Sequence, residues 1–79
     1  MVFLEYVRTE GDEVIYDYMP EKEDAPRGTI SVNRRTRERS LLKESSADEQ
    51  QWFMAHAWMR IEQMLDAGRL EKKTYAAWS

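Results

Sequence analysis

The sequence predicts an α+β fold, in which a four-stranded antiparallel sheet of two hairpins precedes one long C-terminal helix packed on one face. Short segments rich in β-branched and aromatic residues fill the first half of the chain. Turn-forming residues separate these segments at hairpin positions. A helical period then runs through the apolar positions of the second half. With 79 residues the chain is expected to form one small α+β domain, residues 1–79.

The first hairpin is expected from residues 2–8 and 14–19, joined around Gly11, which can adopt a positive φ. Its register is open to two readings. Setting Glu5 opposite Asp17 places like charges together, which is unfavourable. We therefore predict a register shifted by one residue, with Glu5 opposite Tyr18 and Val7 opposite Tyr16.

The second hairpin is expected from residues 29–33 and 39–43. Polar and apolar residues alternate in its first strand, which predicts that Ile30 and Val32 face the core. Asn33 can begin the turn through its own side chain. Arg37 occupies a position where a glycine would be more favourable, so this loop is expected to be either slightly strained or longer than the minimum.

The helix is predicted between a capping box at Ser46 and Glu49 and a C-cap at Gly68, a span of about 21 residues or roughly 30 Å. Apolar residues spaced by three, four and seven form one stripe that should pack on the sheet. The stripe comprises Met54, Ala57, Trp58, Ile61, Met64 and Leu65.

Composition restricts the function classes. The formal net charge is −3, there is no cysteine, and there is one histidine. Thiolate metal sites and disulfides are therefore excluded, and we expect no cofactor and no enzymatic activity. The longest uncharged run, residues 50–59, is much shorter than the ~20 residues of a membrane span, so we predict a cytoplasmic protein without membrane contact.

A second group of large side chains lies on the helix, roughly opposite the core stripe. Trp52, His56 and Met59 follow one another at spacings of four and three. Either the C-terminal tail, residues 71–79, folds back so that Tyr75 and Trp78 cover this face, or the face binds a protein partner or a second copy of the chain. Trp, Met and Tyr are enriched at protein interfaces.

Four arginines within six positions suggest phosphate contact, and hence a nucleic-acid-associated protein. The acidic isoelectric point of about 5.1 argues against it. Nucleic acid is therefore an improbable partner, and pairing with Glu21, Glu23 and Asp24 or simple solvation is the favoured interpretation. If the four arginines form the charged rim of a protein interface, they provide charge complementarity to an acidic partner surface. The four are Arg34, Arg35, Arg37 and Arg39.

Two arrangements could support catalysis. His56 could act as a base or metal ligand, but neither an orienting group nor a second His or Cys accompanies it. Glu5 and Asp17 could form a carboxylate pair, but such chemistry needs a cleft that a chain of this size rarely builds. A small ligand-binding protein or enzyme whose site is completed across a dimer remains a second alternative.

Residues 5–12, residues 28–33, residues 56–58 and Trp78 resemble short bacterial proteins of unassigned function. The resemblance extends over nearly the whole chain and implies no activity, cofactor or catalytic residue. The sequence thus favours a small non-enzymatic protein-interaction module that binds either a protein partner or a second copy of the chain as a homodimer.

Overall fold

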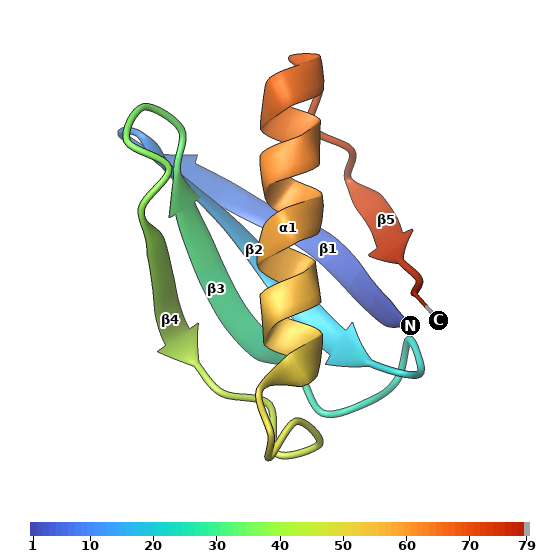
Figure 1. Cartoon of the computed structure of the whole chain (residues 1–79). Coiled ribbons are helices and arrows are strands. Elements are labelled where there is room, and N and C mark those ends of the chain that lie inside the picture. The colour runs from blue at the N-terminus through green and yellow to red at the C-terminus, as the bar shows by residue number, and fades with distance from the viewer. Residues whose placement is uncertain (79) are drawn as a thin grey trace.

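The computed structural model describes residues 1–78 as a five-stranded antiparallel sheet with one helix across one face (Figure 1). The strands follow the spatial order β4-β3-β2-β1-β5. The predicted α+β class, with an antiparallel sheet and one helix, is confirmed. The elements are β1 (Val2–Glu10), β2 (Glu13–Pro20), β3 (Gly28–Asn33), β4 (Arg39–Lys43), α1 (Trp52–Ala67) and β5 (Lys73–Ala76).

The prediction of four strands is wrong, because the C-terminal tail adds a fifth. β5 pairs antiparallel with β1, with Val2 opposite Ala76 and Phe3 opposite Tyr75. Thr74 and Tyr75 are residue types that strands favour, but a segment of four residues is too short for local propensity to identify it as a strand. The free edge of β1 supplies the missing hydrogen bonds, and the Tyr16 hydroxyl donates to the carbonyl of Glu71 just before the strand.

The core lies between α1 and the sheet face that it covers. Alternate residues of three strands are completely buried there, as the period-two pattern requires. The helix contributes four buried residues of the predicted stripe, while Trp58 and Leu65 pack against them half-buried. The buried strand residues are Val2, Leu4, Val14, Tyr16, Tyr18, Ile30 and Val32.

The register predicted for the first hairpin is wrong. Glu5 lies opposite Asp17, and Leu4 lies opposite Tyr18. A shift by one residue would have turned every side chain of one strand to the other face and put Glu5 beside the core. The like charges are tolerated because the Nη1 of Arg27 lies 2.9 Å from a Glu5 oxygen and 3.1 Å from an Asp17 oxygen.

The helix begins later than predicted, at Trp52 rather than just after Ser46. The capping box is not formed. Instead Asp48 accepts hydrogen bonds from the backbone N–H groups of Phe53 and Met54, and Gln51 enters the helix with φ 61°. An extra turn therefore separates the cap from the first helical residue.

Other local predictions are confirmed. Gly68 ends α1 in the left-handed region, and the N–H groups of Gly68 and Arg69 bond to carbonyls of the last turn. Asn33 accepts backbone hydrogen bonds from its own turn, and Arg37 adopts φ 65°. No helix in residues 1–78 combines the length and hydropathy that crossing a bilayer requires.

Candidate functional site

The predicted partner-binding residues do not all lie together. The tail continues past β5 to the helix, where the Trp78 indole stacks on His56 with ring centroids 3.7 Å apart and planes 6° apart. Tyr75 instead lies on the opposite sheet face, with its ring centroid 6.3 Å from that of Phe3. A strand alternates its side chains, so two residues three apart in this tail point to opposite sides.

Four of the five predicted residues therefore make one surface, which we call the outer helix patch: Trp52, His56, Met59 and Trp78. Trp52 is 65% exposed and Met59 is 46% exposed. Trp78 also meets Phe53 edge-on, at 5.6 Å between ring centroids, which anchors the tail to the helix. A shallow groove runs between the helix and the tail beside His56 and Met59.

His56 has no catalytic setting. Its ring is covered by Trp78, and no carboxylate is hydrogen-bonded to it among the described residues. Within residues 1–78 no cluster of three or more His, Cys, Asp or Glu side chains could hold a metal ion. The histidine therefore serves as a stacking partner for the tail.

The arginine hairpin is tied into the fold by carboxylates other than the predicted ones. Arg34 and Arg35 both contact Asp12 in the neighbouring hairpin turn. Arg37 contacts Asp66 at 2.8 Å, on the last turn of the helix. The predicted pairing with Glu21, Glu23 and Asp24 is wrong, because those residues lie beyond the opposite end of the β2–β3 pair.

Arg39 makes the most defined contact of this group. Its guanidinium binds both oxygens of Glu62 at 2.8 and 2.9 Å, and it also lies over the Trp58 ring at 5.7 Å from the centroid. The hydrogen bond from Arg39 lowers the pKa of Glu62. Arg37 and Arg39 thus tie the second hairpin to α1, and Arg34 and Arg35 tie it to the first hairpin turn, so any phosphate contact would compete with existing ion pairs.

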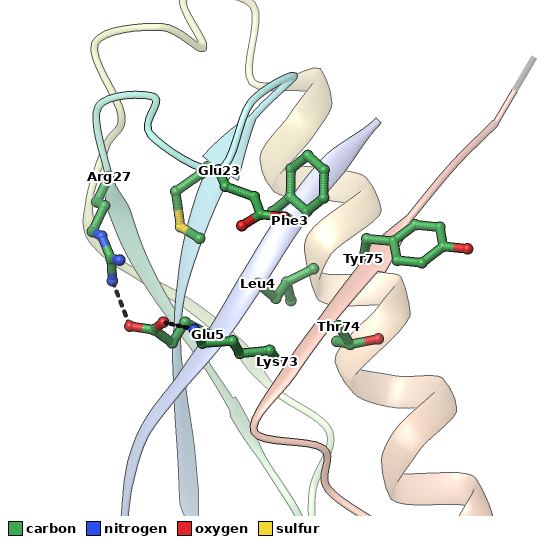
Figure 2. Close-up of a pocket in the computed structure, with 9 residues that line it drawn as sticks. Phe3, Leu4, Glu5, Glu23, Arg27, Lys73, Thr74 and Tyr75 are labelled. Atoms are coloured by element: carbon green, nitrogen blue, oxygen red, sulfur yellow. Dashed lines mark hydrogen bonds and ion pairs between the residues drawn. The ribbon is translucent and has the colours of Figure 1, made fainter.

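The sheet face opposite the helix carries a polar network and one pocket of about 260 Å³. Arg27 and Lys73 both approach Glu5, at 2.9 and 3.8 Å, as Figure 2 shows. The hydrogen bond from Arg27 is the main cause that lowers the pKa of Glu5. Phe3 and Tyr75 form the aromatic wall of the pocket, on the side of β1 and β5.

Sequence reasoning did not find this pocket, because it depends on β5 and on the loop of residues 21–27. The apolar run Val2–Leu4 does not show on its own which residues face away from the helix; the pairing of β1 shows that Phe3 and Glu5 share the face that the helix does not cover. Neither the family models, nor the curated proteins, nor the solved structures with which the chain was compared give a match. The outer helix patch and the pocket on the uncovered sheet face are thus the two surfaces of this chain that could bind a partner or ligand.

Proposed function

We propose that the protein is a small non-enzymatic interaction module whose outer helix patch pairs with a second copy of the chain. One observation carries the proposal: an indole and a thioether, 65% and 46% exposed, flank the His56–Trp78 stack on the solvent side of α1. The outward face of a surface helix is normally polar. Tryptophan and methionine gather at interfaces, where they contribute large contact areas.

The direction of the helix favours a twofold pair. In an antiparallel pair of helices related by a twofold axis, the two helix dipoles are opposed and attract each other. Glu49 lies just before the helix and Arg69 lies just after it, and neither has an ion-pair partner within residues 1–78. Glu49 of one copy and Arg69 of the other therefore lie toward the same end of the pair, where Arg37 already pairs with Asp66 of the last turn.

The helical spacing defines the register of such a pair. If the axis passes between His56 and Met59, each His56 meets the Met59 of the other copy, and each Trp52 meets Gln63. Met59 then fills the gap beside the stacked His56 and Trp78. The face thus brings together apolar groups at its centre and polar groups at its ends.

The size of the patch limits the affinity. A helix of 16 residues is about 24 Å long, and one helical face buries less than the roughly 800 Å² per partner of a standard interface. We therefore expect a dissociation constant in the micromolar range, with monomers at low concentration.

Sedimentation velocity over a wide concentration range tests the proposal. Wild type should shift from monomer toward dimer as concentration rises, whereas Trp52→Ala should remain monomeric with an unchanged melting temperature. Leu42→Ala is the matched control, because Leu42 is similarly exposed at 56% but lies on β4. Equal dimerisation of Trp52→Ala and wild type, or a monomer throughout, would overturn the proposal.

A further inference from the structure

The pocket on the uncovered sheet face is lined by two carboxylates and two cations, and one of these cations, Arg27, also pairs with a third carboxylate outside the lining, Asp17. Glu5 and Asp17 share Arg27, and Glu5 also approaches Lys73. The second Asp17 oxygen accepts a hydrogen bond from Thr29 at 2.8 Å. Glu5, Asp17 and the two cations neutralise one another. Any further acidic group at the pocket therefore leaves it with a net negative charge.

Glu23 is that further group. It belongs to the loop of residues 21–27, lines the pocket, and has no hydrogen-bond or ion-pair partner in the described part of the chain. Figure 2 shows its side chain extending from the loop toward Phe3. A ligand cation placed there would contact an unpaired carboxylate. An anion would be repelled by that carboxylate and could gain a positive partner only by breaking the ion pairs of Glu5.

The remaining walls suit an apolar body. Phe3 and Tyr75 present rings from adjacent strands, and Met19, only 4% exposed, lies opposite Phe3 on the next strand, β2. Aromatic faces attract organic cations through the ring quadrupole, and a neighbouring carboxylate adds to that attraction. The pocket volume of about 260 Å³ is below the usual range of ~300–1,000 Å³ for ligand pockets.

We propose that this pocket binds a small organic cation: an alkylammonium or arylalkylammonium whose positive head contacts Glu23 and whose apolar body lies against Phe3, Tyr75 and Met19. The site faces away from the outer helix patch, so the proposal is independent of self-association. It goes beyond an interaction module because it assigns a ligand class to the sheet face that the helix leaves uncovered.

Three probes with one aromatic body separate charge from shape: phenethylammonium, 2-phenylethanol and 3-phenylpropionate, titrated at pH 7 and followed by backbone amide shifts. We expect the cation to bind about three- to tenfold more tightly than the alcohol, with shifts centred on Phe3 and Tyr75. The carboxylate should bind most weakly of the three.

Glu23→Gln is the decisive variant, because the side chain has no partner to lose and the fold should persist. Its affinity for phenethylammonium should fall to that for the alcohol, while Glu38→Gln, at an exposed carboxylate in the distant β3–β4 turn, should leave all three affinities unchanged. Tyr75→Ala should weaken all three probes. The proposal is overturned if the carboxylate binds as tightly as the cation, if Glu23→Gln keeps the cation preference, or if no probe binds at millimolar concentration.

Discussion

The two faces of the sheet are built from the same strands but stabilised by different forces. On the face under α1, residues such as Tyr16 and Ile30 are completely buried, and apolar burial dominates. On the other face, Arg27 joins Glu5 to Asp17, and Glu13 accepts hydrogen bonds from Ser31 and Asn33. Because side chains alternate along each strand, the covered face carries the apolar core that stabilises the fold, and the uncovered face carries charged groups that a ligand could contact.

Truncation of an apolar side chain should give the largest difference in unfolding free energy between a buried position on the covered face and an exposed position of the sheet. Ile30→Ala removes a fully buried side chain from the covered face and should cost about 2–5 kcal/mol of unfolding free energy. Leu42→Ala, at a 56% exposed position on β4, should cost less than about 0.5 kcal/mol. Urea unfolding measures both, and similar losses would contradict the proposed difference between the environments.

Overpacking of the covered face is the next largest effect. A Cβ at Gly28 would overlap the Tyr18 ring, which is fully buried and whose hydroxyl accepts a hydrogen bond from the Ser45 N–H. Gly28→Ala should therefore destabilise the protein by about 1–3 kcal/mol. Thermal melting followed by near-ultraviolet circular dichroism tests this, and an unchanged melting temperature would show that the Tyr18 ring can move.

The helix cap gives a smaller effect with an internal control. Asp48→Ala removes the acceptor of the Phe53 and Met54 N–H groups and should cost about 1 kcal/mol, with up to ~2 kcal/mol possible. Ser46→Ala, at the position that the sequence pattern favoured, should change the unfolding free energy very little. If urea unfolding instead shows a larger loss for Ser46→Ala than for Asp48→Ala, the helix is capped by the Ser46–Glu49 box and not by Asp48.

The uncovered face should show the weakest but most pH-sensitive effect. Because the hydrogen bond from Arg27 lowers the pKa of Glu5 below its ordinary value of about 4.5, Glu5 contributes stability above pH 4.5, and this stability is lost as pH falls through the lowered folded-state pKa. Arg27→Gln should flatten that acidic loss, whereas Arg8→Gln, at an exposed pair, should not. Melting temperatures measured between pH 2 and 7 test this difference. The prediction is wrong if the melting temperatures of the two variants fall in parallel as pH is lowered.

Sequence reasoning succeeded where the signal is local. Gly11 and Gly68 adopt the positive φ expected of them, and Asn33 organises its own turn. The alternation of Ile30 and Val32 placed β3 with its apolar side toward the helix. Each of these depends on a few neighbouring residues.

Apart from the helix start, which Asp48 sets locally, the failures share a non-local cause. The register depended on Arg27, which neutralises the opposed pair from a later segment. The fifth strand depended on the free edge of β1, and without that strand the opposite directions of Tyr75 and Trp78 were unpredictable. The helical part of the outer helix patch, Trp52, His56 and Met59, was predictable from the helical period, whereas the pocket was not, because a loop and two strands distant in sequence form it.

The most direct test of the proposed function is the mass of the wild-type chain measured by sedimentation equilibrium at several concentrations across the micromolar range. Pairing through the outer helix patch predicts a weight-average mass that rises from that of the 9.4 kDa chain toward twice this value. A mass that stays at 9.4 kDa at every concentration would contradict it.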